Sequence, residues 1–383
     1  MILMSTISHH HPTAARKIKV LIVEDSAVIR SLLTRWLDAE SDIAVIGTAI
    51  NGREGVQRAG EMTPDVVLLD IEMPVMDGLT ALPGILKSAP MARVIMASNL
   101  TQRGGEVTMR ALAAGASDYL AKPDAALTSA GDYKRDLLFK VRMLGSRALK
   151  QSAQLNTLTS MRQPQIDVEK ASPQPSPTAL PYLKPVTRKA RPQAIFIGSS
   201  TGGPEALKIV VSQLVGKVDV PVFITQHMPP LFTKILADHL AKQTGAQVVE
   251  AQHDEDARAG VFYVAPGNRH MTVVLTTTGL KIKLNDDAQE NFCRPAVDVM
   301  FRSAALALGD KALAIILTGM GSDGREGAKA LVAKSAMIIA QDEETSVVWG
   351  MPGAVVRAGL ATTLKPLPEI GPAILNVMRG VVV

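Results

Sequence analysis

The chain has 383 residues, of which 47% are hydrophobic, 20% are charged and only 3% are aromatic. At roughly 100–200 residues per domain, this length predicts two or three packed domains and excludes a single small module. The single cysteine, Cys293, excludes an internal disulfide and any metal site built on paired cysteines, which favours a reducing compartment. The formal net charge of +5 leaves a nucleic acid or another anionic surface open as a partner.

The first 20 residues form a short polar tail without the apolar core of a signal peptide. No uninterrupted apolar run in the chain approaches the ~18 residues that span a bilayer. We therefore expect a cytoplasmic protein without membrane insertion.

Short apolar runs alternate with helical patterns over residues 17–145. The runs are KVLIVED, IAVIGTA, DVVLLDI, RVIMAS and DYLAKP, and a helical segment follows each one. They are apolar throughout and do not alternate in polarity, which is typical of parallel strands covered by helices on both faces. The pattern predicts a doubly wound parallel α/β domain.

Residues 146–192 have a different composition from the regions on either side. They contain seven prolines among Ser, Thr and Gln, and no hydrophobic period continues beyond about Leu158. This composition predicts an extended linker. Over residues 193–383 the strand and helix patterns resume, with a hairpin expected over HMTVVLTTTGLKIKL and a last predicted strand at MIIAQ. A second α/β domain, also doubly wound, is therefore expected there.

The net positive charge belongs to the linker. Residues 17–145 carry 15 basic and 16 acidic side chains, and residues 193–383 carry 17 and 18. The linker carries 8 basic against 2 acidic side chains, and Arg16 in the tail accounts for the remaining charge. The charge thus indicates a solvated, self-repelling tether and removes the support that composition gave to a nucleic-acid partner.

Charged and polar residues of the first domain gather where its strands end. Glu24 and Asp25 end the first run, Asp70 the third, Ser98 the fourth and Lys122 the fifth. Because the carboxyl ends of parallel strands meet at one rim, the three carboxylates require a cation there, and Mg²⁺ suits oxygen ligands. Asp70 can then attack a phosphoryl donor while Lys122 neutralises the developing charge. Each acid alone is compatible with a helix cap, which explains neither Lys122 nor the convergence.

These motifs resemble those of a response-regulator receiver domain. The acidic pair, LLDIEMPVMDG around Asp70 and YLAKP stand in the order of that family. The resemblance implies that Asp70 is the phospho-acceptor and that the three carboxylates hold Mg²⁺ for phosphorylation. It also implies a phosphorylation switch formed by Ser98, Tyr119 and Lys122. The first acid is Glu24, where Asp is more common in the family.

The second domain begins with a strand that runs into the small-residue turn SSTGGP at residues 199–204. The free backbone N–H groups of such a turn suit an anion, either a bound phosphate or a transient oxyanion. The turn alone is compatible with a phosphate loop, a tight turn or a nucleophile turn. The lack of a P-loop or dinucleotide-binding glycine motif disfavours a nucleotide.

Two further strand ends favour a nucleophile in this turn. His227 follows the run PVFITQ, and Asp323 follows ALAIILTGMGS. In a parallel sheet, serine, histidine and aspartate would reach the same rim and can act as nucleophile, general base and orienter. Taken singly, each has a simpler interpretation: Asp323 as a turn residue, and His227, like His239 and His253, as an ordinary core or surface histidine.

Five motifs in this domain, GSSTGGP, TQHMP, VAPGNRHM, RPAVDVMFRSA and LTGMGSDG, resemble the catalytic domain of the chemotaxis protein-glutamate methylesterase family, CheB. That family joins a receiver to this domain in the same order. The resemblance implies Ser200 as nucleophile, His227 as base and Asp323 as its partner. It also places Thr201 and the backbone around Met320 in the oxyanion region.

Three residues near these motifs have less certain roles. The choice of Ser200 over the adjacent Ser199 depends on the resemblance and not on chemistry. His270 belongs to a matching motif and is either a structural histidine or part of the site wall. Cys293 has no motif that ties it to a histidine and is interpreted as structural.

The resemblance implies a phosphorylation-activated serine hydrolase that demethylates glutamyl methyl esters of chemoreceptors and deamidates specific glutamines, giving adaptation in chemotaxis. Its implied partners are chemoreceptor cytoplasmic domains and a histidine kinase, and the hydrolase site would need no cofactor. Two alternatives remain: a response regulator whose second domain only binds a nucleic acid or a protein, and a hydrolase for another ester or amide. The mixed charge of the helices after residue 193 disfavours DNA binding. We expect an unphosphorylated receiver to dock over the Ser200 rim.

Overall fold

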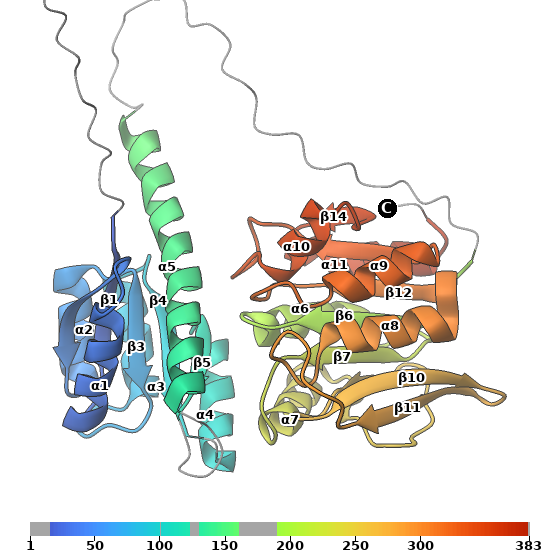
Figure 1. The fold of residues 1–383 in the computed structure, drawn as a ribbon, viewed down its shortest axis with the longest axis horizontal. Coiled ribbons are helices and arrows are strands. Elements are labelled where there is room, and N and C mark those ends of the chain that lie inside the picture. The colour runs from blue at the N-terminus through green and yellow to red at the C-terminus, as the bar shows by residue number, and fades with distance from the viewer. Residues whose placement is uncertain (1–15, 100, 123–129, 161–189, 382–383) are drawn as a thin grey trace, which may run out of the picture.

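The fold consists of two α/β units that lie side by side, as a computed structural model shows (Figure 1). The structure describes residues 16–99, 101–122, 130–160 and 190–381. Each unit has a parallel sheet with helices on both faces, which confirms the predicted fold class. The predicted N-terminal tail and most of the predicted linker lie outside these ranges. Within them, no helix is long and apolar enough to cross a membrane.

The first unit has a parallel sheet in the order β2-β1-β3-β4-β5. Its strands are β1 (Ile18–Val23), β2 (Ile43–Ala49), β3 (Val66–Asp70), β4 (Arg93–Ser98) and β5 (Asp118–Ala121). Its helices are α1 (Ala27–Asp38), α2 (Gly52–Met62), α3 (Gly78–Ser88), α4 (Gln102–Ala113) and α5 (Ala130–Ser160). Helices α1 to α4 each begin at a side chain that accepts a hydrogen bond from the first turn, which are Ser26, Asn51, Asp77 and Thr101. All strands predicted from the sequence in this region are present.

Helix α5 is longer than the sequence analysis predicted. It continues to Ser160, through residues that were assigned to the linker. Leu137, Val141, Leu144 and Ala148 are all buried and recur at the spacing of one helical face. Because this spacing continues past residue 145 and no proline occurs between that residue and Pro164, no proline stops the helix at the predicted boundary.

The second unit has a sheet in the order β14-β13-β12-β6-β7-β9-β8, in which all recorded pairings are parallel. Its strands are β6 (Ala194–Ser199), β7 (Val222–Gln226), β8 (Val248–Glu250), β9 (Phe262–Val264), β12 (Ala312–Ile316), β13 (Met337–Gln341) and β14 (Thr363–Lys365). Its helices are α6 (Gly203–Leu214), α7 (Phe232–Thr244), α8 (Val297–Leu308), α9 (Arg325–Ala333), α10 (Met351–Arg357) and α11 (Leu367–Met378), with a short 3₁₀ turn, η1 (Gly309–Lys311). The predicted hairpin is present as β10 (His270–Thr276) and β11 (Gly279–Asn285).

The sequence analysis did not predict β8, α10, β14 or α11. The two strands have three residues each and α10 has seven, so their patterns are too short to recognise. Helix α11 contains an internal proline, Pro372, which obscures its helical pattern.

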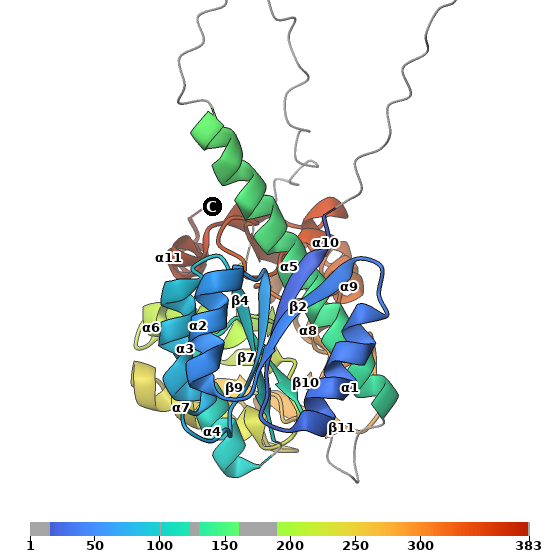
Figure 2. The ribbon, with the colours of Figure 1, turned by 90° about the vertical axis from the view of Figure 1, so that its left-hand side faces the viewer.

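The two units share an apolar interface formed by α4, β5 and α5 of the first unit. Figure 2 shows the first unit in front of the second. The ring of Tyr119 stacks on Phe232 of α7, with ring centroids 5.2 Å apart. Helix α4 also lies very close to α7, since a Cβ on Gly105 would come within 2.4 Å of Ile235 Cδ1. One hydrophobic cluster therefore continues from the core of the first unit into the second.

A substitution at Gly78 tests how tightly the loop after β3 is packed. A Cβ there would lie 2.0 Å from the backbone oxygen of Asp70, so we expect Gly78→Ala to lower the free energy of unfolding by about 1–3 kcal/mol. The matched control is Gly60→Ala on α2, where the new Cβ meets only Ser88 at 3.4 Å. Urea unfolding of the full chain would measure both variants. An equal effect at the two glycines would contradict this account.

Candidate active site and phosphorylation site

Ser200, His227 and Asp323 lie at one rim of the second sheet. Ser200 directly follows β6, His227 directly follows β7, and Asp323 lies in the loop between β12 and α9. The strands β12, β6 and β7 are neighbours in the sheet, so their carboxyl ends are adjacent. The structure therefore brings together the three residues that the motifs single out.

Asp323 is the most strongly held member of this set. Its Oδ2 lies 2.7 Å from His227 Nε2 and accepts the backbone N–H of Val297 at 2.6 Å. Its Oδ1 accepts the backbone N–H of Asp298 at 2.9 Å and the side-chain amide of Asn291 at 3.1 Å. Burial raises the pKa of Asp323, but His227 and the N–H donors at the start of α8 outweigh it and lower the pKa below its ordinary value.

The two adjacent serines have different environments. Ser199 is fully buried, and its hydroxyl lies 2.7 Å from Gln226 Oε1. Ser200 is partly exposed. Of the two serines, only Ser200 is therefore exposed to solvent, which supports on structural grounds a choice that the sequence based on resemblance alone.

Cys293 lies closer to the candidate site than the sequence analysis predicted. Its Sγ is 3.5 Å from His227 Nδ1, whereas among the described hydrogen bonds none joins the Ser200 hydroxyl to this imidazole. Burial lowers the pKa of His227, but Cys293 and Asp323 outweigh it and hold the pKa well above its ordinary value. The available signal was the position of Cys293 directly before RPAVD, the motif whose backbone binds Asp323.

The two residues assigned to the oxyanion region lie against the first unit. Thr201 is almost fully buried, and its hydroxyl donates a hydrogen bond of 2.6 Å to Asp118 Oδ2 at the start of β5. Met320 belongs to a buried apolar cluster with Leu137 and Val141 of α5. The first unit therefore covers the loop next to Ser200.

The surroundings of His270 are those of a histidine that stabilises the fold. It is fully buried, its Nε2 lies 3.0 Å from the backbone oxygen of Ala288, and its Nδ1 accepts the backbone N–H of Ala296 at 3.2 Å. Both ring nitrogens are thus used by the backbone just before α8. This supports the structural interpretation over a role in the site wall.

The rim of the first sheet gathers the predicted carboxylates around one lysine. Lys122 Nζ lies 2.7 Å from Asp70 Oδ1 and 3.1 Å from Glu24 Oε2. Glu24, Asp25 and Asp70 each offer a carboxylate oxygen, and these oxygens lie within 4.8 Å of one another. Burial raises the pKa of Glu24 and of Asp70, because Lys122 only partly offsets the cost of two buried acids. This oxygen-only donor set, rich in negative charge, fits a divalent cation such as Mg²⁺.

The other two residues of the predicted switch, Ser98 and Tyr119, lie between this rim and the interface. The Ser98 hydroxyl donates to the Gly104 backbone oxygen at 3.2 Å and accepts from Thr108 Oγ1 at 2.8 Å, so it is bound to α4. Tyr119 is buried against the second unit, and burial raises the pKa of its phenol well above the ordinary value. The ends of β4 and β5 are thus in direct contact with elements that meet the second unit, so a structural change at either end would reach the interface.

Comparison with known proteins identifies both units. A family model described as "Response regulator receiver domain" matches residues 20–130, and one described as "CheB methylesterase" matches residues 195–374. The chain is therefore a response regulator whose receiver domain is followed by a methylesterase-type domain.

Full-length relatives specify the family. The chain is 44% identical to a protein-glutamate methylesterase/protein-glutamine glutaminase of Maricaulis maris (strain MCS10), over 94% of this chain and 96% of the relative. It is 46% identical to protein-glutamate methylesterase/protein-glutamine glutaminase 2 of Caulobacter vibrioides, over 95% and 99%. A crystal structure of the Thermotoga maritima CheB methylesterase catalytic domain matches 49% of this chain and all of that domain, with 36% identity and a TM-score of 0.48. The chain belongs to the protein-glutamate methylesterase/protein-glutamine glutaminase family.

Proposed function

We propose that this chain is a phosphorylation-activated serine hydrolase that demethylates glutamyl methyl esters of chemoreceptors and deamidates specific glutamines, giving adaptation in chemotaxis. The observation that carries the proposal is the set of Ser200, His227 and Asp323 on neighbouring strand ends of a domain that matches the methylesterase model. The names of the full-length relatives supply the substrate class. The partners would be cytoplasmic: the receptor domains that are the substrate and a histidine kinase that phosphorylates the receiver.

The chemistry follows from the positions of the ring nitrogens. Because Asp323 holds Nε2 of His227, Nδ1 is the nitrogen that takes the proton from Ser200 as its oxygen attacks the side-chain carbonyl. His227 returns this proton to the leaving methanol or ammonia, and Asp323 stabilises the imidazolium. Backbone N–H groups near Thr201 and Met320 bind the oxyanion, each worth about 3 kcal/mol. Water then attacks the acyl-enzyme and releases glutamate.

Replacing the nucleophile gives the most direct test of this chemistry. Ser200→Ala should reduce methanol release from a methylated receptor by at least about 10³-fold, because no group remains to form the acyl-enzyme. Ser199→Ala is the matched control and should keep activity within about threefold, since the removed hydroxyl is buried away from substrate. If Ser199→Ala were the inactive variant, the assignment of the nucleophile would be wrong.

The pKa of His227 predicts the pH dependence. Only the neutral imidazole can accept a proton, and its pKa is raised, so kcat/KM should rise with pH through a limb above the ordinary histidine value. Cys293→Ala removes one of the groups that raise this pKa and should move the limb to lower pH. Methanol release measured across pH for both proteins tests this. A limb that stays in place, or moves to higher pH, would show that Cys293 does not act on His227 in this way.

The receiver would control the hydrolase through phosphorylation of Asp70. We propose that Glu24, Asp25 and Asp70 hold Mg²⁺, which neutralises the carboxylates and the incoming phosphoryl group when it is bound. Lys122, which lies 2.7 Å from Asp70, would also neutralise charge there. Ser98 would turn from α4 toward the phosphoryl oxygen, and its contacts with α4 would change.

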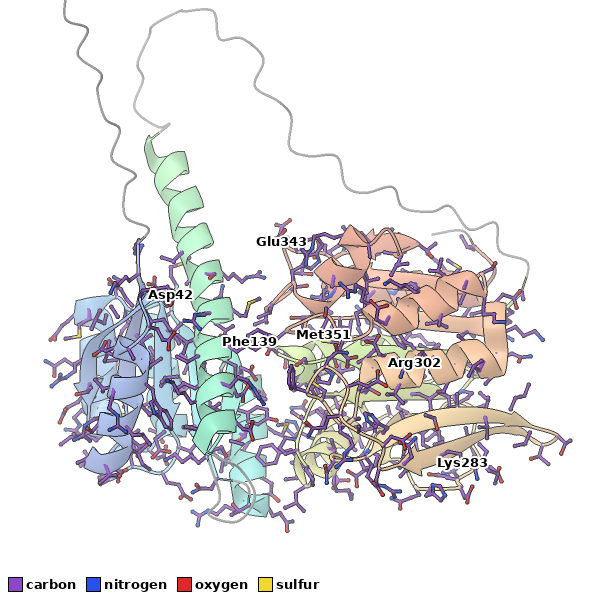
Figure 3. The ribbon with its side chains drawn as sticks, in the orientation of Figure 1. Asp42, Phe139, Lys283, Arg302, Glu343 and Met351 are labelled. Carbon is purple, nitrogen blue, oxygen red and sulfur yellow. The ribbon has the colours of Figure 1, made fainter. Side chains whose placement is uncertain are left out.

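The interface supports an inhibited state in the absence of phosphorylation. Asp118 binds Thr201 next to the nucleophile, and Lys140 of α5 holds Asp118 at 3.2 Å. About two turns further along α5, Arg147 donates to the backbone oxygens of Glu343 and Glu344. Figure 3 shows Phe139 on α5 and Glu343 on opposite sides of this boundary. In this arrangement the receiver would keep a receptor helix away from Ser200, and a shift from mostly closed to mostly open requires a free-energy difference of several kcal/mol between the two states.

Replacing Arg147 tests the docking of the receiver on the second unit without changing a residue of the candidate active site. Arg147→Ala removes two hydrogen bonds across the interface, so basal methanol release without a phosphodonor should rise about 3–10-fold. Arg142→Ala is the control on the same helix, because the partners of Arg142 among the described residues, Glu40 and Asp42, both lie within the receiver. Fully phosphorylated protein should show equal activity in all three forms. Unchanged basal release in Arg147→Ala, or an equal rise in both variants, would contradict the inhibited state.

A further inference from the structure

Gln226 is a buried polar residue that the proposed chemistry does not use. It ends β7 directly before His227 and is only 2% exposed. Its Nε2 donates to the backbone oxygen of Ser200 at 2.9 Å and to that of His227 at 3.3 Å. We propose that Gln226 is a positioning residue that fixes the nucleophile relative to the general base, an inference that rests on the proposed hydrolase function.

The hydrogen-bond chemistry allows only one orientation of this amide. The backbone oxygens of Ser200 and His227 can only accept, so the amide nitrogen must face them. The amide oxygen then faces Ser199, whose hydroxyl must donate to it at 2.7 Å. The two serines and the histidine are thus connected through one side chain.

Gln226 acts at the point where the strand pairing ends. The parallel register of β6 and β7 ends at Ser199 opposite Gln226, and a last backbone bond runs from His227 N–H to the Ser199 oxygen at 3.2 Å. Beyond this point the side chain of Gln226 replaces the backbone pairing and spans from one strand end to the other. Because a misplacement of about 1 Å can cost ~100-fold in rate, such a bridge has a direct effect on catalysis.

The turn before α6 is packed around this amide. A Cβ on Gly203 would lie 1.9 Å from Gln226 Oε1 and 3.0 Å from Ser199 Cβ, so only glycine allows the turn to close over the glutamine. The backbone N–H of Gly203 also donates to the Ser200 oxygen at 2.7 Å. The Ser200 backbone is therefore held from both the glutamine and the turn.

Three substitutions separate the functions of the amide. Gln226→Met removes both polar atoms at similar volume, Gln226→Glu keeps an acceptor for Ser199 but loses the N–H donors, and Ser199→Ala removes only the donor to the amide oxygen. The full chain is activated with a small phosphodonor and Mg²⁺. Methanol release gives kcat and KM, and the rate of labelling by a fluorophosphonate gives the reactivity of Ser200 without the receptor. Titration with the same reagent counts folded sites, so kcat is expressed per reactive site.

We expect Gln226→Met and Gln226→Glu to lower both kcat and the labelling rate about 10–100-fold with KM within about twofold, and Ser199→Ala to stay within about threefold. A merely structural role would lower the number of titrated sites and leave kcat per site unchanged, which would overturn the proposal. It would also be overturned if Gln226→Glu labelled at the wild-type rate. If wild-type protein labels but releases no methanol, the proposed function fails, while the labelling rates still decide the role of Gln226.

Discussion

Asp323 is almost completely buried, and a carboxylate in that position is stable only because hydrogen-bond donors surround it. The backbone at the start of α8, the side chain of Asn291 and the ring of His227 all bind it. Removing one partner of a buried charge costs about 3–5 kcal/mol, so these groups depend on one another. The carboxylate thus fixes the histidine ring through its Nε2, which leaves Nδ1 as the nitrogen that would serve Ser200 in the proposed chemistry. The orientation of the His227 ring at this rim therefore depends on the buried carboxylate of Asp323.

Buried acids also lie at the rim of the first sheet, but there the surrounding groups do not fully compensate their negative charge. Asp70 and Glu24 are buried acids whose pKa values are raised, since Lys122 is the one cation that the structure places between them. An excess of negative charge at Asp70 suits the metal ion and the phosphoryl group that we propose for this rim. The contacts of Ser98 with α4, and of β5 and α5 with the second unit, give a short physical route from this rim to Thr201.

The sequence predicted most of this organisation because its signals are local. Apolar runs identified the parallel strands, and residues at the strand ends identified both rims, where the order of the sheet brings Ser200, His227 and Asp323 together. The length of α5 was underestimated, although the apolar spacing of Leu144 and Ala148 continued past the predicted boundary. Elements of three to seven residues, such as β8, β14 and α10, have too few positions to show a period.

Contacts between distant segments could not be predicted in the same way. Nothing in the motifs indicates that Asp118 binds Thr201, because this pair meets only when the two units dock. The same holds for Cys293 and His227, which are 66 residues apart and approach each other only when the second unit has folded. The different roles of Ser199 and Ser200 likewise depend on burial, which the sequence does not record. The resemblance favoured Ser200, and the structure adds that Ser200 is partly exposed whereas the hydroxyl of Ser199 is buried against Gln226.

The central claim is that the receiver covers the rim that carries Ser200 until Asp70 is phosphorylated. Amide hydrogen exchange of the full chain, with and without Mg²⁺ and beryllofluoride as a phosphoryl mimic, tests it directly. The account predicts faster exchange on activation in two segments that touch the receiver, residues 200–203 and 318–322, while β6 and β12 stay protected. Unchanged exchange in those two segments at full occupancy of Asp70 would contradict it.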